Sequence, residues 1–466
     1  LVMGLGRFGG GVGVARWLVA QGATVTVNDA AAADTLADSI AQLHGLPITF
    51  KLGGHDPADF LAADLLVLNP AVDKHTSPAV QAALAAGIPY TTEMNLFLER
   101  CPAFTIGITG SVGKSTTTAL IFEALKAGLH QSSDAPQQDS PRVFLGGNIG
   151  RSLLSDLPAI RPQDLVVLEL SSFMLEDTPR IHWSPRVAVV TNLYPNHLDR
   201  HQTLALYSAA KQNLLRFQKP GDVAILNNDH DLVSRWTRIA EAQGARVVKY
   251  TTRGPQGPLP LVIPGEHNQS NARAALAVLE ALPPDLPLDK AGAGNAILHF
   301  PGLAHRLQLV HTLHLPMPGE ERTLRFYNDS KATTPDASLT ALHAFPRGSA
   351  IFIVGGYDKH IDLSPFHTAL AAHAGGVLGI GQTGQAIVDA VRALGGELLP
   401  ERMVYAATLE AAVPIALYWS AADPTLNAIV LSPASASWDQ FPNYEKRGEL
   451  FISAAKSAAR GVNAAS

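Results

Sequence analysis

The segment 110–116 has the residue types of a phosphate-binding loop. It reads Gly-Ser-Val-Gly-Lys-Ser-Thr, follows the apolar run 106–109 and precedes a helical pattern. Glycines let backbone N–H groups turn toward phosphate oxygens, the start of a helix adds partial positive charge, and Lys114 adds a full charge. Ile108 stands where the longer form of this motif has a glycine. The spacing therefore predicts a nucleotide site of the shorter Gly-x-x-Gly-Lys-Ser form, in which Ser115 or Thr116 can reach a metal ion.

A second glycine-rich loop stands near the start of the sequence, at Gly4, Gly6 and Gly9. With Asp29 at the end of the next predicted strand, this spacing fits the dinucleotide-binding fingerprint. An NAD-dependent oxidoreductase would satisfy the pattern. The pattern requires only a diphosphate close to the start of a helix, so a nucleotide-sugar diphosphate would satisfy it as well. A tight turn that serves packing alone is the remaining interpretation.

Four polar residues of the middle segment are further candidates. Glu169 ends a predicted buried strand beside the phosphate loop, where a carboxylate can hold magnesium, a cation that prefers oxygen ligands. His197 is either a metal ligand or a structural histidine. Asn148, in a Gly-Gly-Asn-Ile-Gly turn, could contact a phosphate or acyl oxygen, although a turn asparagine is the default. Spacing alone makes Lys211, on a predicted helix, a solvated surface charge.

An α/β architecture must position these residues, because apolar runs typical of buried strands alternate with helical stretches along nearly the whole chain. The predicted strands are 23–29, 65–68, 104–108, 165–168, 187–190, 223–226, 324–328, 350–354, 376–380 and 428–431. The predicted long helices are 115–127, 203–217 and 444–459. The polar stretch 131–142 and the Pro- and Gly-rich stretch 254–264 are predicted surface loops. Boundaries near Glu99 and at Pro301-Gly302 give three predicted domains, 1–99, 100–302 and 303–466.

Composition limits the classes of function. The 466 residues are 47% hydrophobic, enough for more than one packed core, and the net charge of −5 gives no footprint for nucleic acid or anionic membranes. No apolar run is long enough to span a bilayer. The single cysteine, Cys101, fits a reducing compartment. We expect a cytoplasmic monomer with no nucleic-acid partner and no membrane insertion.

Taken together, these pieces resemble the Mur ligase family over essentially the whole chain. The resemblance rests on GLGRFG, ITGSVGKST, GGNIG, LELSSF, NHLDRH, AAK at Lys211, GEHNQSN, PGLAHR, NDSKATT, the turn 355–359 and LSPASASWDQF. Each motif is weak alone, but their joint order and spacing are highly specific. The resemblance implies a Rossmann-like N-terminal domain for a UDP-sugar, a central parallel-sheet domain of the P-loop ATPase type, and a Rossmann-like C-terminal domain for the incoming amino acid.

The resemblance also implies amide ligation through an acyl phosphate. ATP phosphorylates a substrate carboxylate, the amine of an amino acid attacks, and phosphate leaves, so that catalysis is mainly positioning and charge neutralisation. The last loop and the NDSKATT run favour the members that add glutamate to UDP-N-acetylmuramoyl-L-alanine. We expect D-glutamate, although an L-glutamate-adding relative remains open, because stereochemistry is not legible in the sequence.

The resemblance assigns roles by position. Catalytic roles go to Lys114, Asn148, His197 and Lys211. ATP contacts go to Gly110, Ser111, Gly113, Lys114, Ser115, Thr116, Asn268, Asn271, Arg306, Asp329 and Lys331. The ligands of two Mg²⁺ ions would be Ser115, Glu169, His197 and Lys211. Substrate contacts go to Gly6, Arg7, Phe8 and Asp29 for the UDP-sugar, and to Thr333, Lys359, Ser432 and Phe441 for glutamate. Lys211 would be carbamylated, which turns a cation into a carboxylate-like anion and reverses its interpretation as a surface lysine.

Three residues depart from the family pattern. Asn196 removes a common acidic charge beside His197, Ala30 lacks a hydroxyl that can help to hold uracil, and Val112 replaces a common asparagine that need not touch phosphate. The loop 131–142 also looks longer than usual. The alternatives that stay open are an alanine- or diaminopimelate-adding ligase, a folylpolyglutamate synthase, an NAD-dependent oxidoreductase and a nucleotide-binding module without catalysis.

Overall fold

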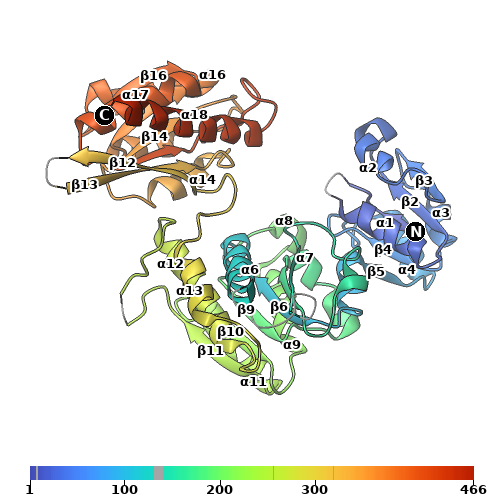
Figure 1. The fold of residues 1–466 in the computed structure, drawn as a ribbon. Helices are drawn as coiled ribbons and strands as arrows, with labels where there is room; N and C mark the ends of the chain where they lie inside the picture. Colours follow the sequence, from blue (N-terminus) through green and yellow to red (C-terminus); the bar gives the residue numbers. More distant parts are fainter. Residues whose placement is uncertain (7–8, 131–139, 256, 318–319, 466) are drawn as a thin grey trace. The chain divides into compact units, whose positions relative to one another are not determined.

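The computed structural model describes residues 1–6, 9–130, 140–255, 257–317 and 320–465, which form three separate β-sheets with their helices (Figure 1). The chain divides into two compact units. The first holds Leu1–Pro258 and Ser270–Ile297, and the second holds Leu259–Gln269 and Leu298–Ser466. The predicted α/β class is confirmed. Each sheet falls inside one of the three predicted ranges, and the boundaries near residues 99 and 302 stay predictions.

The first sheet lies in the first unit. Its strands are β1 (Val2–Met3), β2 (Val25–Asp29), β3 (Ile48–Leu52), β4 (Leu66–Leu68) and β5 (Tyr90–Thr92). Its helices are α1 (Gly10–Ala20), η1 (Ala33–Leu36), α2 (Ala37–Ala41), α3 (Pro57–Leu61), α4 (Pro78–Ala85) and α5 (Glu93–Leu98). All strands are parallel, in the order β3-β2-β1-β4-β5. The chain reverses its direction across the sheet between β1 and β4, and ligands of such sheets bind outside the carboxyl ends of the strands at this point.

The central sheet also lies in the first unit. Its strands are β6 (Phe104–Thr109), β7 (Val143–Gly147), β8 (Leu165–Glu169), β9 (Val187–Val190), β10 (Val223–Asn227) and β11 (Arg246–Tyr250). The helices of this part are α6 (Lys114–His130), η2 (Leu157–Ala159), α7 (Ser172–Leu175), η3 (Thr178–Ile181), α8 (Leu198–His201), α9 (Leu204–Arg216), α10 (Asp231–Ser234), α11 (Thr237–Ala242), α12 (Glu266–Ala281) and α13 (Lys290–Leu298).

The strands of the central sheet are parallel, in the order β11-β10-β9-β6-β8-β7. Strands β8 and β9 are buried along their whole length, as expected for a parallel sheet that is covered on both faces. Because β6, β8 and β9 are neighbours, the residues that follow their carboxyl ends meet at one edge of the sheet. This edge carries the predicted phosphate loop.

The third sheet lies in the second unit. Its strands are β12 (Gln308–Met317), β13 (Glu320–Asn328), β14 (Ala350–Val354), β15 (Gly376–Ile380), β16 (Met403–Ala407) and β17 (Ala428–Leu431). Its helices are α14 (Pro335–Leu342), α15 (Ser364–His373), α16 (Gly381–Leu394), η4 (Pro400–Arg402), α17 (Leu409–Ala422) and α18 (Tyr444–Ala465). Alternate residues of β14 enter two different core clusters, Phe352 and Val354 in one and Ile351 and Ile353 in the other, so both faces are buried.

The strand order of the third sheet is β12-β13-β17-β14-β15-β16, and β12 is antiparallel to β13. The sheet is therefore mixed, which differs from a purely parallel Rossmann-like sheet. We did not predict β12, because an edge strand alternates buried and exposed residues, such as Leu313 and His314, and lacks a continuous apolar run.

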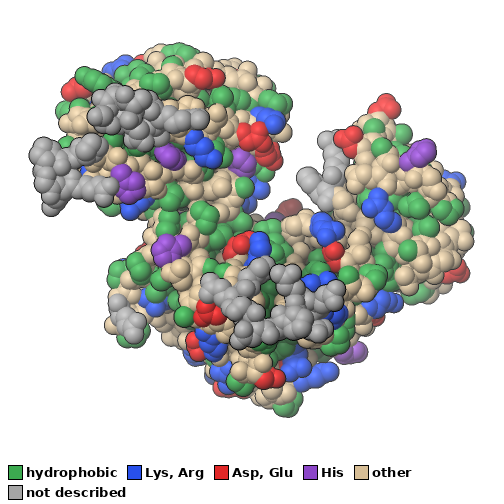
Figure 2. Space-filling view, viewed as in Figure 1, with side chains coloured by type: hydrophobic (Ala, Val, Ile, Leu, Met, Phe, Trp, Pro, Cys, Tyr) green, Lys and Arg blue, Asp and Glu red, His purple; other side chains and the backbone are tan. Residues whose placement is uncertain are grey.

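Two observations bear on the expectation that neither a membrane nor a nucleic acid is a partner. Within the described residues, none of the helices combines the length and apolar character that a membrane span requires. On the face that Figure 2 shows, the Lys and Arg side chains outside the grey atoms are scattered among acidic ones and do not gather into one broad basic patch.

Candidate functional site

The predicted phosphate loop joins β6 to α6. Gly113 has φ 82°, a left-handed conformation, and a Cβ at this position would lie 2.5 Å from Asn271 Oδ1. A side chain here would therefore be both strained and obstructed. Asn271, a predicted adenine contact on α12, also accepts a hydrogen bond from Thr117 Oγ1 at 3.2 Å. The structure thus places Asn271 against the loop, within the first unit.

Lys114 is the first residue of α6 and points back over the loop. Its Nζ donates to the carbonyl oxygens of Gly110 at 3.0 Å and Ser111 at 2.9 Å. Ser115 and Thr116 are half-buried in the first turn of the helix. An ammonium group and a helix start thus face the same loop, an arrangement suited to phosphate. Val112 is 56% exposed.

Asn192 holds this loop, a role that the sequence did not reveal. Its Oδ1 accepts from the backbone N–H groups of Ser111 at 3.0 Å and Val112 at 2.9 Å. Its Nδ2 donates to the carbonyl of Val112 at 3.0 Å. Asn192 follows β9, which is the neighbour of β6. A polar residue directly after a buried strand is the signal that could have identified it.

Glu169 ends β8 and lies beside the predicted Asn148. Asn148 Nδ2 donates to Glu169 Oε1 at 2.9 Å, and the Asn148 backbone N–H donates to the Glu169 carbonyl at 2.8 Å. The other carboxylate oxygen, Oε2, is buried and has no hydrogen-bond partner among the described residues. A buried carboxylate oxygen without a protein partner is costly unless a cation or water satisfies it. Glu169 therefore fits a bound divalent cation.

Lys211 is almost fully buried on α9, contrary to the surface position that spacing alone suggested. Its Nζ donates to the Gly110 carbonyl at 2.8 Å and to Thr109 Oγ1 at 3.3 Å, and it lies 4.6 Å from the centre of the Tyr207 ring. Burial holds the pKa of Lys211 well below its usual value, Lys114 lowers it further, and Glu169 opposes this shift. The surroundings therefore shift the protonation equilibrium of Lys211 toward the neutral amine, beside the phosphate loop.

His197 is exposed just before α8, with φ 53°. Its ring lies 5.0 Å from that of Phe173 and 6.3 Å from that of Tyr207. Burial lowers the pKa of His197, as does Lys211, and the nearby Asp199 partly opposes them. Neutral imidazole is the form that binds metals. Asn196, which departs from the family pattern, accepts a hydrogen bond through its Oδ1 from the His197 backbone N–H at 2.8 Å.

A metal centre made of acidic and histidine side chains alone is not present in the part of the chain that the structure describes. Groups of three or more His, Cys, Asp or Glu that could hold a metal ion do not occur there. The predicted ligands differ from such a group, because they include the Ser115 hydroxyl and a modified Lys211. Their roles stay predictions.

The first glycine loop lies outside β1, at the point where the chain reverses its direction across the first sheet. Gly4, Gly6 and Gly9 have φ of 91°, 61° and 85°. Asp29, at the end of β2, accepts from the Gly6 backbone N–H at 3.2 Å and from that of Ala31 at 2.9 Å. Asp29 thus supports the loop. Arg7 and Phe8 lie outside the described residues, as does most of the predicted loop 131–142.

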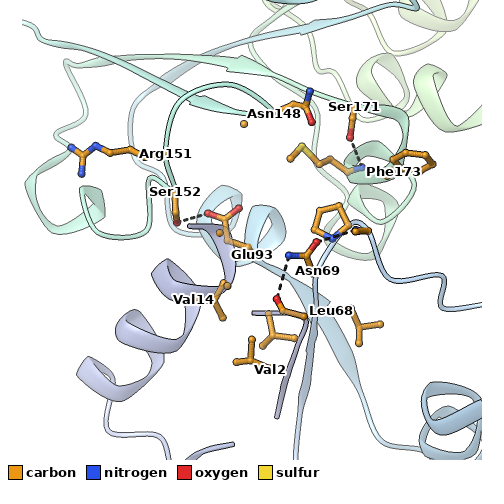
Figure 3. Close-up of a pocket in the computed structure, with 18 of the residues that line it drawn as sticks. Val2, Val14, Leu68, Asn69, Glu93, Asn148, Arg151, Ser152, Ser171 and Phe173 are labelled. Carbon is orange, nitrogen blue, oxygen red and sulfur yellow. Dashed lines mark hydrogen bonds between the residues drawn. The ribbon is translucent and has the colours of Figure 1, made fainter. Parts of the chain in front are cut away.

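A cavity of about 410 Å³ connects the first glycine loop with the turn that bears Asn148 (Figure 3). Gly4 and Gly11 are among the lining residues. In Figure 3, Glu93 lies between Val14 on one side and Asn148 on the other. The volume lies within the range of about 300–1,000 Å³ that is typical of ligand pockets. One elongated ligand can therefore reach from the first loop to the edge of the central sheet near Glu169.

The second unit brings Asp329 and Ser432 together at the ends of neighbouring strands β13 and β17. Ser432 is fully buried, with its hydroxyl 2.8 Å from Asp329 Oδ2 and 2.9 Å from Ser338 Oγ. Lys359 Nζ donates to the Thr333 carbonyl at 3.5 Å. The pair of Thr333 and Lys359 is thus assembled, whereas the hydroxyl of Ser432 already has protein partners.

The remaining predicted residues of the second unit are Asn268, Arg306, Lys331 and Phe441. Asn268 Nδ2 donates to the Pro264 carbonyl at 2.7 Å, and Arg306 is exposed. Phe441 packs against an apolar core cluster of this unit. The aromatic ring next to a predicted ATP contact is that of Tyr444, which lies 5.3 Å from Lys331 Nζ. From the sequence we named Phe441 and not Tyr444, because nothing in the motif distinguishes these two aromatic residues.

Asp329 makes the pH dependence of stability testable. Burial raises its pKa from 3.8 to about 7, against opposing hydrogen bonds from Ser432 and the Leu307 backbone. The folded state then keeps a proton that the unfolded chain has lost, so this group's stabilising contribution falls as pH rises from about 4 to 7. We expect Asp329→Asn to remove this fall, on the order of 1–4 kcal/mol, in urea unfolding at several pH values. The exposed Asp336→Asn is the control, and equal pH slopes for wild type and Asp329→Asn would contradict the prediction.

Two family models match the chain. The model described as Mur ligase middle domain matches residues 108–259, and that described as Mur ligase MurD-like, N-terminal domain matches residues 1–92. The UDP-N-acetylmuramoylalanine--D-glutamate ligase of Roseiflexus sp. (strain RS-1) is 35% identical to this chain, with 97% of each chain covered. The enzyme of the same name from Symbiobacterium thermophilum is also 35% identical, with 94% of each covered.

Solved structures share the fold. The UDP-N-acetylmuramate-alanine ligase MurC from Thermotoga maritima superposes with a TM-score of 0.54 at 20% identity, covering 98% of this chain and 99% of that one. A UDP-N-acetylmuramoyl-L-alanyl-D-glutamate--2,6-diaminopimelate ligase gives a TM-score of 0.54 at 18% identity, covering 84% and 92%. At these identities the likeness concerns the fold alone, and it agrees with the predicted three-domain α/β architecture.

Proposed function

This chain belongs to the Mur ligase family, and on that premise we propose that it is an ATP-dependent ligase that adds D-glutamate to UDP-N-acetylmuramoyl-L-alanine in peptidoglycan precursor synthesis. The observation that carries the proposal is the 35% identity, over nearly the full length, to relatives that bear the name of this reaction. The site supports it, because one edge of the central sheet combines a phosphate loop, a buried carboxylate and a buried lysine.

The reaction follows from what these groups can do. A terminal carboxylate oxygen of the substrate attacks the γ-phosphorus of ATP, and ADP leaves. The neutral amine of glutamate then attacks the carbonyl carbon of the acyl phosphate. The resulting tetrahedral intermediate loses the nitrogen-bound proton to solvent and expels phosphate, which gives the amide. Lys114 neutralises charge on the β- and γ-phosphates, and Asn148 holds Glu169 and lies near the transferring group.

Magnesium fits this edge of the sheet. The buried Oε2 of Glu169, which has no protein partner among the described residues, is the kind of hard oxygen ligand that Mg²⁺ prefers. Ser115 and Glu169 would hold one ion, and His197 with a carbamylated Lys211 would hold the second. Bound Mg²⁺ supplies positive charge against the phosphate oxygens.

Carbamylation of Lys211 is supported by its surroundings. A neutral amine adds through its lone pair to the carbon of CO₂, and the carbamic acid formed then loses a proton at neutral pH. Burial favours the neutral amine, and the hydrogen bonds to Gly110 and Thr109 place it beside the loop. The carbamate would carry a negative charge, which suits a cation-binding site.

The other assignments complete the proposal. The first glycine loop would bind the uridine diphosphate, with Gly6, Arg7, Phe8 and Asp29, and the second unit would bind glutamate through Thr333 and Lys359. Ser432 and Phe441 belong to the same assignment, as do the ATP contacts Asn268, Arg306, Asp329 and Lys331. Domains 1–99, 100–302 and 303–466 would serve the UDP-sugar, ATP and glutamate. We propose that the protein acts as a cytoplasmic monomer.

The deciding experiment measures phosphate release from ATP with UDP-N-acetylmuramoyl-L-alanine and either D- or L-glutamate. We expect release that depends on all three substrates, with D-glutamate preferred. Release that depends on alanine or diaminopimelate instead would assign another amino acid within the family. ATP turnover without any change in nicotinamide absorbance would exclude the oxidoreductase alternative.

A further inference from the structure

The side chain of Glu93 lies in the middle of the cavity that connects the first glycine loop with the Asn148 turn. Glu93 is the first residue of α5, which follows β5 in the first sheet. Apolar side chains, among them Val2, Val14 and Leu68, line the part of the cavity contributed by the first sheet and α1 (Figure 3). A carboxyl group in this position faces the middle part of an elongated ligand that fills the cavity.

Ser152 holds the Glu93 carboxyl group. Ser152 Oγ donates to Glu93 Oε1 at 2.6 Å (Figure 3). Ser152 is itself packed against α1, because a Cβ added to Gly13 would lie 2.6 Å from Ser152 Cβ and 2.7 Å from its Oγ. Ser152 therefore has little room to move, and Glu93 Oε2 has no hydrogen-bond partner within the described part of the chain. The hydrogen bond from Ser152 thus orients one carboxyl oxygen and leaves the other available to a ligand.

The surroundings of Glu93 raise the pKa of its carboxyl group. The described residues give Glu93 no cationic partner, and its one hydrogen bond comes from Ser152. Burial raises the pKa of Glu93, and the bond from Ser152 opposes this shift. The carboxyl oxygens can accept hydrogen bonds from hydroxyl and amide groups of a ligand in the cavity.

We propose that Glu93 is a specificity-determining residue, which hydrogen-bonds the uncharged middle of the nucleotide-sugar substrate, between its diphosphate and its terminal carboxylate. This inference rests on the proposed function, which supplies a substrate with hydroxyl and amide groups in that part. Ser152 is the residue that orients Glu93. The first loop then binds the diphosphate, and Glu93 hydrogen-bonds the sugar part that is attached to it.

Binding measurements on the full chain test this role without the need for turnover. Calorimetry would compare UDP with UDP-N-acetylmuramoyl-L-alanine for wild type, Glu93→Ala and Glu93→Gln. We expect Glu93→Ala to bind the nucleotide sugar about tenfold more weakly, as for one lost hydrogen bond, and to bind UDP as wild type does. Glu93→Gln keeps a carbonyl oxygen that can accept hydrogen bonds from Ser152 and from the ligand, so it should retain most of the affinity.

The control is Glu99→Ala, the same change on an exposed residue directly after the same helix, which should bind both ligands as wild type does. Equal affinity of Glu93→Ala and wild type for the nucleotide sugar would overturn the inference. An equal loss for UDP would also overturn it, because the change would then act on the loop, and so would a Gln variant as weak as the Ala variant. If wild type bound UDP but not the nucleotide sugar, the proposed function itself would fail.

Discussion

Replacing Lys114 with alanine is expected to lower the rate of ATP-dependent phosphate release by about 10³-fold. The Lys114 ammonium lies within 3.0 Å of two carbonyl oxygens of the phosphate loop, so it is positioned where the phosphates of ATP would bind. Its charge offsets the negative charge that is shared by the phosphate oxygens while the γ-phosphoryl group moves. Steady-state phosphate release over a range of ATP concentrations would separate the loss in kcat from a rise in KM.

Lys126→Ala is the matched control for this prediction. Lys126 lies on the same helix, is largely exposed, and makes an ion pair with Glu123 at 3.8 Å. Its replacement should leave the rate unchanged. Circular dichroism should show that both variants stay folded. If Lys114→Ala kept a rate close to that of wild type, the loop would not be the ATP site.

The second large effect is expected for Lys211→Ala, which should lower the ligation rate by about 10²-fold and regain part of it in acetate or formate. If Lys211 is carbamylated, alanine removes both a buried side chain and its negative charge. The space left beside Gly110 and Thr109 can then admit a small carboxylate, which restores the charge. The rate would be measured against added acetate, with chloride at equal ionic strength.

Lys211→Met distinguishes the effect of the lost charge on the rate from the effect of the lost side-chain volume. Methionine fills most of the volume of lysine but carries no charge, so this variant should be as slow as Lys211→Ala and should not respond to acetate. Recovery of Lys211→Met by acetate would show that the salt acts elsewhere. Full activity of Lys211→Ala without acetate would contradict a carbamate at this position.

The phosphate loop is the part of the site that the sequence predicted most completely. Its residues are contiguous, so a strand, two glycines, a lysine and a helix start specify the geometry without distant partners. The left-handed φ of Gly113 and the position of Lys114 over the loop follow from this local pattern. The buried parallel strands, such as β8 and β9, were predicted because a strand buried on both faces is a continuous apolar run. The partly buried parallel strands β3, β5, β7, β11 and β16 were not predicted.

Features that depend on distant partners could not be predicted in this way. Asn192 is 80 residues from Val112, and Glu93 is 59 residues from Ser152, yet each pair shares a hydrogen bond. The edge strand β12 has no continuous apolar run, and the contact of the Ser432 hydroxyl with Asp329, 103 residues away, could not be read from the motifs. In each case the missing information was the identity of the neighbouring segment.

The sequence by itself therefore determined the α/β class, the phosphate loop at Lys114 and the family, because these depend on local patterns and on the order of motifs. Only the tertiary structure revealed the burial of Lys211, the unpartnered oxygen of Glu169 among the described residues and the place of Glu93 in the cavity. Burial and charge are properties of the space around a side chain, and that space is formed by segments far apart in the chain. A lysine on a helix is a surface cation until the sheet that covers it is known.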